Sequence, residues 1–283
     1  MRVLVLGAGG MAGHVIATYL SEKGHTVSTV SASNKFDDNT TLLDATNTAD
    51  LRNYLESNSF DVVVNCIGIL IQQSESRKDL AAYLNGYLPH FLEYFYRDSQ
   101  TRVIHLSTDC VFSGENAPYQ EDSPYDGQIF YDRSKALGEI NNDKDLTFRM
   151  SIIGPDMQQK GVGLFNWFYA QTGVINGYQK ALWDGITTIE LAKGIDDAIT
   201  QNLTGLYHLV PDTNISKYDL LQLFVRVFDR TDITVNPETT TISDKTLINT
   251  RTDFSHTIPT YEVMLTEMKT WIKDHQGLYE HYR

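Results

Sequence analysis

The stretch Arg2-Val-Leu-Val-Leu-Gly7-Ala-Gly-Gly10-Met-Ala-Gly13 decides the fold of this 283-residue chain. Its apolar run Val3–Leu6 indicates a buried strand, and apolar residues at helical spacing follow over 11–23. Between strand and helix, Gly7 permits a tight turn, Gly10 lets a pyrophosphate approach the backbone, and Gly13 lets the helix pack closely. Free N–H groups at the helix start would face the anion. The stretch therefore predicts a dinucleotide-binding loop.

Beyond this loop, short apolar runs alternate with longer helical patterns as far as Arg149, and we expect at least five β–α units there. The expected strands cover 26–30, 61–67 and 103–106, and the expected helices cover 48–57 and 80–96. Strands that are apolar throughout and separated by helices indicate a parallel sheet with helices on both faces. The predicted fold class is α/β, a Rossmann-type doubly wound sheet with a smaller mixed lobe.

After Arg149 the pattern changes, and the expected elements are helices over 189–200, 218–228 and 264–275 and a strand over 206–210. We interpret residues 1–150 as a dinucleotide-binding domain, to which 184–212 returns. Residues 151–183 and 213–283 are interpreted as a substrate-binding lobe.

The segment after the second strand bears on which dinucleotide binds. An acidic residue there would hold the ribose hydroxyls of NAD, but Ser31 and Lys35 stand in this segment instead. Small hydroxyls and a lysine suit a 2′-phosphate, which favours NADP over NAD, although Lys35 can equally be a solvated loop charge. Asp44 would either hydrogen-bond the adenine amine or cap a turn.

A tyrosine and a lysine four residues apart, Tyr131 and Lys135, lie at the start of an expected helix. Positions i and i+4 share one helical face, so we expect the ammonium, together with a cationic nicotinamide ring, to lower the phenol's pKa from its usual value of about 10. The pair could then exchange a proton with a carbonyl or an alcohol. Ser107 and Thr108 end a strand nearby, where a hydroxyl would either hold the substrate oxygen or cap a turn.

Composition excludes several classes of partner. With 23 Lys and Arg against 36 Asp and Glu, the net charge is −13, which argues against nucleic acid and anionic membranes. No apolar run approaches the roughly 18 residues of a spanning helix. The two cysteines, Cys66 and Cys110, fit a reducing compartment, so we expect a cytoplasmic protein. The eight histidines show no metal-ligand spacing, and we expect no metal site.

Four motifs in order carry a family resemblance: Gly7-x-x-Gly10-x-x-Gly13, Ser107-Thr-Asp-Cys-Val-Phe-Ser-Gly114, Pro118-Tyr119-x-Glu121 and Tyr131-x-x-Ser-Lys135-x-x-x-Glu139. Later segments agree, namely Phe148-Arg-Met-Ser-Ile-Ile-Gly154, Trp183-Asp-Gly-Ile-Thr-Thr and Gly205-Leu-Tyr-His-Leu. Over nearly its whole length the chain resembles an extended short-chain dehydrogenase/reductase of the dTDP-4-dehydrorhamnose reductase family. The resemblance implies reduction of a nucleotide-linked 4-keto-6-deoxysugar by NAD(P)H, for surface polysaccharide precursors.

The resemblance also implies roles for individual residues. Tyr131 would protonate the keto oxygen, Lys135 would hold the nicotinamide ribose, and Thr108 would hydrogen-bond the oxygen. The implied cofactor set is Gly7, Gly10, Met11, Ala12, Gly13, Ser31, Lys35, Asp44, Ala45, Cys66, Ile67, Gly68 and Lys135. The implied substrate set is Asp109, Cys110, Asn166, Trp183 and Arg251, with Arg251 preferred over Arg149 for the substrate pyrophosphate.

The chain departs from the family pattern at three positions. Cys110 replaces a tyrosine, Ile152 a tryptophan, and Asp132 the glycine after the catalytic tyrosine. The lost aromatics indicate a reshaped pocket, which suggests an N-acetylated sugar on UDP. A catalytic thiol at Cys110 has no histidine partner in the pattern and is disfavoured. The aromatic-rich segment 91–96 is interpreted as core or subunit packing, which would make a homodimer.

Two other functions stay open. One is a non-catalytic NADP-binding regulatory subunit, a role that the family includes as the methionine adenosyltransferase accessory subunit. The intact Thr108, Tyr131 and Lys135 favour an enzyme over such a subunit. The other is a sugar-nucleotide epimerase or dehydratase, and a dehydratase would carry Asp-Glu where Asp109-Cys110 stands.

Overall fold

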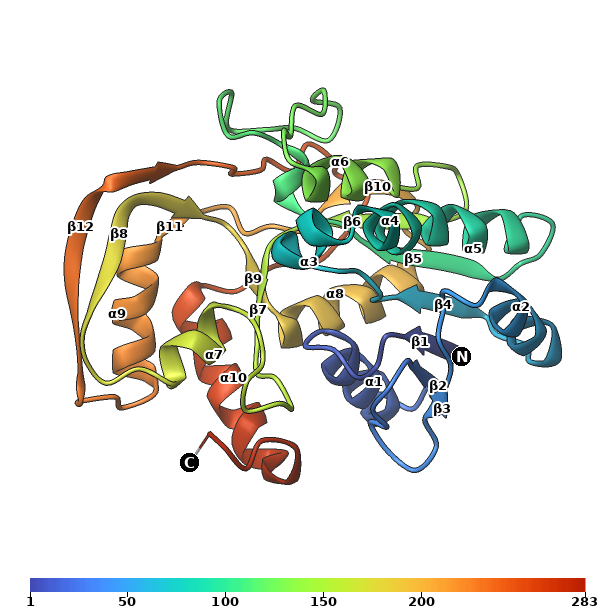
Figure 1. The fold of residues 1–283 in the computed structure, drawn as a ribbon, viewed down its shortest axis with the longest axis horizontal. Helices are drawn as coiled ribbons and strands as arrows, with labels where there is room; N and C mark the ends of the chain where they lie inside the picture. Colours follow the sequence, from blue (N-terminus) through green and yellow to red (C-terminus); the bar gives the residue numbers. More distant parts are fainter. Residues whose placement is uncertain (283) are drawn as a thin grey trace.

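Seven parallel strands form the central sheet of a computed structural model, which describes residues 1–282 (Figure 1). Their order across the sheet is β10-β6-β5-β4-β1-β2-β3. The strands are β1 (Arg2–Leu6), β2 (Thr26–Ser31), β3 (Thr41–Leu42), β4 (Val62–Asn65), β5 (Arg102–Leu106), β6 (Leu146–Arg149) and β10 (Gly205–His208). The predicted α/β class and Rossmann-type sheet are confirmed, because the chain reverses direction across the sheet between β1 and β4.

Helices cover both faces of this sheet (Figure 1). Val3 and Val5 point into a core shared with α1 (Gly13–Glu22) and α8 (Thr188–Gln201). Leu4 and Leu6 point into the opposite core, shared with α2 (Thr48–Ser57) and α5 (Leu88–Tyr96). Side chains alternate between the faces of a strand, and both faces of β1 are buried. This is why the run Val3–Leu6 is apolar without interruption.

The single helix expected over 80–96 is divided. The structure has α3 (Ile71–Ser76), α4 (Lys78–Ala81), a π-helical segment (Ala82–Tyr87) and then α5. The π-helical segment places Asn85 inward, where its Oδ1 accepts the Ile69 N–H at 2.9 Å and its Nδ2 donates to Ser134 Oγ at 3.1 Å. Ser134 belongs to α6 (Phe130–Leu137), so Asn85 ties α6 to the segment after β4. π-Helical turns often occur at functional sites.

A smaller lobe lies beyond one end of the sheet (Figure 1). Its main strands, β8 (Gly173–Trp183) and β12 (Ile233–Ser243), run parallel, with β11 (Ile215–Ser216) on the other edge of β8. The lobe's helices are α7 (Leu164–Tyr169), α9 (Lys217–Val227) and α10 (Tyr261–Asp274), and the short pair β7 (Ile152–Ile153) and β9 (Ile186–Thr187) adjoins it. Neither long strand was expected from the sequence. Because β10 joins the main sheet, residues 184–212 include an element of it, although the proposed domain bounds stay a prediction.

Within residues 1–282, no helix combines the length and the apolar character needed to cross a membrane.

Candidate active site

The glycine loop after β1 has the geometry that its sequence requires. Gly7 takes φ +85°, a conformation that favours glycine, and its N–H donates to the Val30 carbonyl at 2.9 Å. A Cβ on Gly13 would lie 2.2 Å from the Gly7 oxygen, so only glycine lets α1 begin this close to the strand. Around Gly10 a Cβ would meet only that same oxygen, at 3.4 Å. The backbone at Gly10 is therefore open to a ligand.

A cavity of about 260 Å³ lies beside this loop, at the carboxyl ends of β1, β2 and β4. It is lined by Gly7, Gly9, Gly10, Val30, Ser31, Ala32, Ser33, Asn34, Leu43, Asp44, Ala45, Cys66, Ile67, Gly68, Leu84 and Gln158. Most of the predicted cofactor residues meet here, whereas Met11, Ala12, Gly13, Lys35 and Lys135 are not in its lining.

Gly9 and Gln158 were missed in the sequence. A Cβ on Gly9 would lie 2.7 Å from Ser31 Oγ, so the close approach of Ser31 favours glycine at this position. Gly9 lies within the glycine motif itself. Gln158 comes from the loop after β7, which no sequence signal linked to the cavity. Asp44 caps a turn, since its Oδ1 accepts the Thr46 N–H at 2.9 Å. It also lines the cavity, and its contact with adenine stays a prediction.

Helix α6 buries Tyr131 and Lys135 together, with 8% and 6% of their surfaces exposed. The backbone N–H of Tyr131 donates to Glu75 Oε1 at 3.0 Å, so α3 anchors the first turn of α6. Asp132 Oδ2 accepts the N–H groups of Gln128 and Ile129 and caps the same turn. The departure from the family glycine at position 132 therefore has a structural explanation. Nothing in the sequence indicated Glu75.

The pKa of Tyr131 is raised, not lowered as expected. Burial is the main cause, and the Cys110 thiol adds to it, while the Thr108 hydroxyl opposes it by hydrogen bonding to the phenol. The expectation was wrong because the Lys135 ammonium is directed elsewhere. Its Nζ donates to the Leu106 carbonyl at 2.6 Å. Tyr131 is therefore a protonated phenol at neutral pH.

Lys135 has an unusual neighbour in the buried His105, 3.5 Å from its Nζ. Asn65 Oδ1 accepts the Ile67 N–H, so the Asn65 Nδ2 group must donate to His105 Nδ1, at 3.2 Å. Neutral His105 then carries its proton on Nε2, facing Lys135. Burial lowers the pKa of His105 well below its ordinary value and that of Lys135 to about 8. His105, a polar residue within an apolar strand, thus belongs to the site and not merely to the core.

The two hydroxyls at the end of β5 take different roles. Ser107 Oγ donates to Glu139, which also pairs with the fully buried Arg149 at 2.6 Å. Ser107 therefore braces the strand end and does not face the cavity. Thr108 Oγ1 accepts the Cys110 N–H at 3.2 Å, so it caps the following turn, and it donates to Asp109 Oδ1 at 2.9 Å. It also lowers the pKa of the nearby Tyr131 phenol. Of the two hydroxyls, Thr108 is the one beside Tyr131, and to donate to a substrate oxygen it would exchange its bond to Asp109 for one to that oxygen.

Two of the five predicted substrate residues lie beside Tyr131. Asp109 and Cys110 influence the Tyr131 phenol electrostatically and so lie close to it. Burial raises the pKa of the Cys110 thiol to about 12, so it is a poor nucleophile, as expected. The sequence analysis did not single out Asp184, which follows Trp183. Burial raises the pKa of Asp184 to about 7, and the nearby Asp109 carboxylate raises it further.

Two of the predicted substrate residues are engaged elsewhere. Arg251 pairs with Asp253 and donates to the carbonyls of Thr204 and Leu206, at the amino end of β10, so it does not reach the site. Asn166 Oδ1 accepts a hydrogen bond from Tyr282. Arg251 is thus occupied by partners that only the tertiary structure provides. The Nδ2 group of Asn166 is buried with no hydrogen-bond partner among residues 1–282, so its substrate role stays a prediction.

Trp183 is buried in the lobe, and its Nε1 donates to Ser151 Oγ at 2.8 Å. Among residues 1–282, no group of three His, Cys, Asp or Glu residues is placed to hold a metal ion.

A Rossmann-type sheet, a glycine loop and a buried tyrosine and lysine one helical turn apart define a short-chain dehydrogenase/reductase. A family model described as the RmlD substrate binding domain matches residues 1–273, and the chain belongs to this family. The resemblance to the dTDP-4-dehydrorhamnose reductase family is thereby confirmed.

Curated relatives and solved structures agree with this assignment. A probable low-salt glycan biosynthesis reductase of Haloferax volcanii is 33% identical over 54% of this chain and 54% of its own length. A dTDP-4-dehydrorhamnose reductase of Streptomyces griseus is 33% identical over 49% of this chain and 43% of its own length. The chain therefore spans about half the length of these relatives.

Among solved structures, a dTDP-4-dehydrorhamnose reductase of Bacillus anthracis in complex with NADP superposes with a TM-score of 0.79. It is 19% identical, covering 95% of this chain and 99% of that one. At this identity the likeness shows the fold.

Proposed function

We propose that this protein is an NAD(P)H-dependent reductase of a nucleotide-activated 4-keto-6-deoxysugar, serving surface polysaccharide or glycan synthesis. The observation that carries the proposal is the convergence of Thr108, Tyr131 and Lys135 at the carboxyl ends of the strands, close to the glycine-loop cavity. Gly68 lies between this group of residues and the cavity. It lines the cavity, and a Cβ added to it would lie 3.9 Å from Lys135 Nζ.

The chain's own residues supply the proton chemistry of such a reduction. When bound, the dinucleotide supplies the hydride to the keto carbon. Tyr131 donates its phenolic proton to the oxygen that gains negative charge, and its raised pKa keeps that proton in place until then. Thr108 holds the same oxygen by a hydrogen bond. Lys135, whose ammonium is held by the Leu106 carbonyl, would hold the nicotinamide ribose.

NADP is the preferred cofactor in this proposal, with NAD as the alternative. The small residues Gly7, Gly10 and Gly68 form a cradle that suits a dinucleotide, because added Cβ atoms would fill it or strain it. Ser31, at the end of β2, lies in the cavity without a neighbouring carboxylate on that strand end. Lys35 is exposed and free to approach a 2′-phosphate.

The sugar nucleotide is proposed as dTDP-4-dehydrorhamnose or a close dTDP-linked relative. The support is the family and a relative whose own name carries that substrate. A UDP-linked N-acetylated sugar is the second candidate, because Cys110 and Ile152 stand where the family carries aromatic residues. We assign cofactor binding to 1–150 with 184–212, and substrate binding to 151–183 and 213–283.

A cytoplasmic location and a homodimer complete the proposal. The two cysteines are free thiols, which suits a reducing compartment. Tyr87 and Tyr94, on the outer surface of the helices that follow β4, are 48% and 63% exposed, and Leu137 of α6 is 64% exposed. We propose these side chains for the dimer interface. Light scattering of the purified protein, which measures its mass in solution, would test for the dimer.

The test is NADPH consumption by the purified protein with dTDP- and UDP-linked 4-keto-6-deoxysugars, followed at 340 nm. We expect turnover with the dTDP sugar, and a fall of about 10²- to 10⁴-fold in kcat for Tyr131→Phe with NADPH affinity retained. Faster turnover of the UDP sugar would assign the second candidate. NADPH binding without turnover of any sugar would support the regulatory subunit. Tightly held NAD that survives purification would support an epimerase or dehydratase.

A further inference from the structure

A buried chain of hydrogen bonds joins the C-terminal segment to the glycine loop. His14, in the first turn of α1, lies 2.8 Å from the Gly10 carbonyl through Nδ1 and 2.7 Å from the Tyr279 hydroxyl through Nε2. The indole Nε1 of Trp271, on α10, donates to the same hydroxyl at 3.0 Å. His14 is 0% and Tyr279 1% exposed, so water does not compete for these bonds.

The direction of every bond in this chain is fixed. A carbonyl oxygen only accepts, so Nδ1 of His14 carries the proton and donates to Gly10. In the neutral ring Nε2 is then an acceptor, and Tyr279 must donate to it. The Tyr279 oxygen accepts from Trp271, because an indole nitrogen only donates. Burial lowers the pKa of His14, which keeps the ring neutral as this pattern requires.

The anchored carbonyl controls a donor of the predicted pyrophosphate site. The Gly10 carbonyl and the Met11 N–H belong to one planar trans peptide, so they point in opposite directions. Holding the carbonyl against His14, which lies deeper in α1, directs the Met11 N–H out of the helix start. That is where an anion binds at a helix N-terminus.

We propose that Tyr279 is a positioning residue for the cofactor, acting through His14 to orient the Gly10–Met11 peptide toward the pyrophosphate. The inference rests on the proposed dinucleotide site and extends it, because it gives the C-terminal segment, 265 residues distant from His14 in sequence, a role in cofactor affinity. Cofactor binding and the packing of α10 are then coupled.

The test measures NADPH affinity by isothermal titration calorimetry. Tyr279→Phe keeps the ring but removes the hydroxyl, and we expect NADPH to bind about three- to tenfold more weakly, the loss of about one hydrogen bond's contribution. The KM for NADPH should rise by a similar factor while kcat at saturation stays within about twofold. The matched control is Tyr261→Phe, which removes a buried hydroxyl of α10 that donates to the Thr213 carbonyl and should leave NADPH affinity unchanged.

A second ligand separates positioning from general loss of structure. 2′-AMP carries the adenine and the 2′-phosphate without a pyrophosphate, so its affinity should be the same in Tyr279→Phe and the unaltered protein. At His14, asparagine places an N–H near the Nδ1 position and should retain part of the NADPH affinity. Glutamine reaches the Nε2 position instead and should retain less. Should Tyr279→Phe not fold, Trp271→Phe weakens the same chain and is expected to shift NADPH affinity in the same direction.

The inference is overturned if folded Tyr279→Phe binds NADPH as tightly as the unaltered protein, or if it loses NADPH and 2′-AMP affinity equally. Failure of the unaltered protein to bind either NADPH or NADH would instead overturn the proposed function.

Discussion

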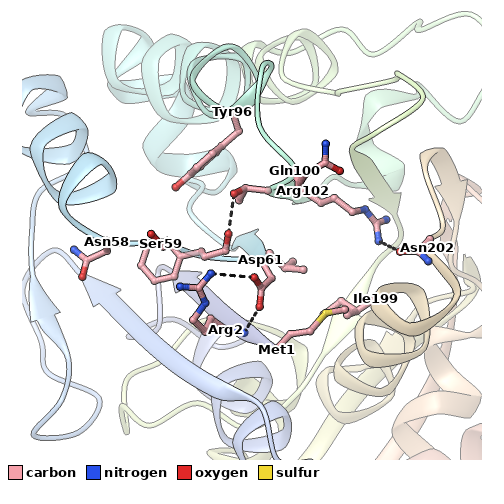
Figure 2. A pocket seen from close by; sticks show the side chains of 13 residues that line it. Met1, Arg2, Asn58, Ser59, Asp61, Tyr96, Gln100, Arg102, Ile199 and Asn202 are labelled. Carbon is pink, nitrogen blue, oxygen red and sulfur yellow. Dashed lines mark hydrogen bonds and ion pairs between the residues drawn. The ribbon is translucent and has the colours of Figure 1, made fainter.

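The two edges of the central sheet differ in how their buried polar groups are used. At the amino ends of β1, β4 and β5 lies a cavity of about 650 Å³ (Figure 2), larger than the 260 Å³ cavity beside the glycine loop at the carboxyl ends. We call the side of the sheet where the strands begin its amino edge and the side where they end its carboxyl edge. By volume alone, the amino edge would be taken for the functional site. The side chains with perturbed pKa values, and with them the proposed site, lie at the carboxyl ends instead, although the cavity there is smaller.

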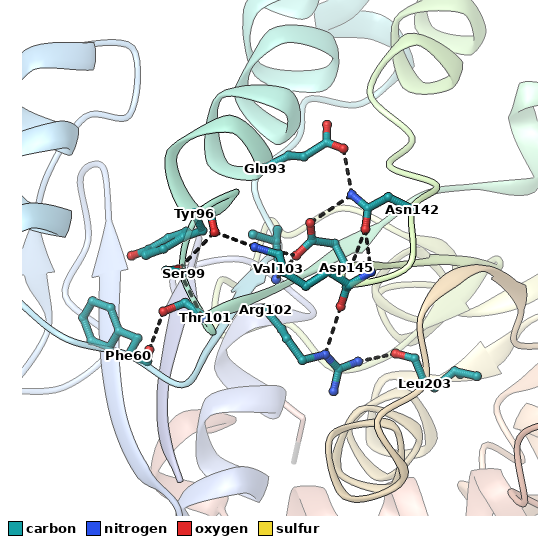
Figure 3. Close-up of polar contacts among 11 residues, drawn as sticks. Phe60, Glu93, Tyr96, Ser99, Thr101, Arg102, Val103, Asn142, Asp145 and Leu203 are labelled. Atoms are coloured by element: carbon teal, nitrogen blue, oxygen red, sulfur yellow. Dashed lines mark hydrogen bonds and ion pairs between the residues drawn. The ribbon is translucent and has the colours of Figure 1, made fainter.

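At the amino edge, polar groups satisfy one another (Figure 3). Asp145 is 1% exposed, and its carboxylate accepts the Val103 N–H at 2.8 Å and Asn142 Nδ2 at 3.0 Å. Arg102 donates to the carbonyls of Lys144 and Leu203. These contacts join the starts of β5 and β6 to the end of α8 and leave little capacity for a ligand.

At the carboxyl edge, burial is less fully matched by hydrogen bonds, although Asp184 Oδ2 accepts the Leu247 N–H. Lys135 has one short hydrogen bond and a neighbouring His105 N–H, and its pKa falls to about 8. Burial also raises the pKa values of Tyr131 and Asp184, which favours the uncharged form of each side chain. The comparison implies that substitutions at the carboxyl edge remove activity and spare stability, while those at the amino edge do the reverse.

The largest effect is expected for Lys135→Met. Turnover should fall by about 10²- to 10³-fold, because the side chain proposed to position the nicotinamide ribose is lost. The free energy of unfolding should rise by about 1 to 2 kcal/mol at pH 7, since a buried cation is replaced by an apolar chain of similar length. Urea denaturation with steady-state kinetics measures both, and a large loss of stability would contradict the comparison.

The gain in the free energy of unfolding from Lys135→Met should shrink as the pH rises. The folded-state pKa of about 8 lies below the ordinary 10.5, so the cost of burying the charge is fully present below pH 8. Between pH 8 and 10.5 the folded protein loses its proton before the unfolded chain does, and the cost fades. Stability curves of the two proteins should therefore converge over that interval.

The opposite outcome is expected at Asp145. Asp145→Ala leaves the Val103 N–H without an acceptor and leaves Asn142 Nδ2 with Glu93 as its remaining one, and the free energy of unfolding should fall by about 2 to 4 kcal/mol. The kcat of the folded fraction should stay within about twofold. Asp145→Asn retains an acceptor for Val103 and should lose roughly half as much stability. A kcat loss in either variant, measured well below its melting temperature, would break the separation of the two edges.

The smallest effect is expected at Tyr96, an exception within the amino edge. Its hydroxyl is buried with no hydrogen-bond partner among the described residues, so Tyr96→Phe should leave the free energy of unfolding within about 0.5 kcal/mol or raise it slightly. The matched control is Thr101→Val, since Thr101 Oγ1 donates to the Phe60 carbonyl at 2.7 Å and its loss should cost about 1 kcal/mol. Thermal unfolding of both variants makes the comparison.

Local sequence predicted the parts of the fold that local rules govern. The run Val3–Leu6 and the glycines after it gave the first strand, the loop and the start of α1, because burial on both faces and steric close approach leave few alternatives. The i, i+4 spacing placed Tyr131 and Lys135 on one face of α6. The strands β8 and β12 escaped prediction, since glycines, asparagines and threonines conceal the pattern of their partly exposed faces.

The sequence by itself determined the sheet, the glycine loop and the residue types of the proton-transfer group. The tertiary structure alone decided their electrostatic state and their supports. Burial, which no spacing reveals, raised the pKa of Tyr131 and lowered that of Lys135. Long-range hydrogen bonds placed Glu75 under the Tyr131 N–H, took Arg251 to the far end of β10, and brought Tyr279 to His14. The physical reason is the same in each case: desolvation and hydrogen-bond partners depend on what the folded chain brings near.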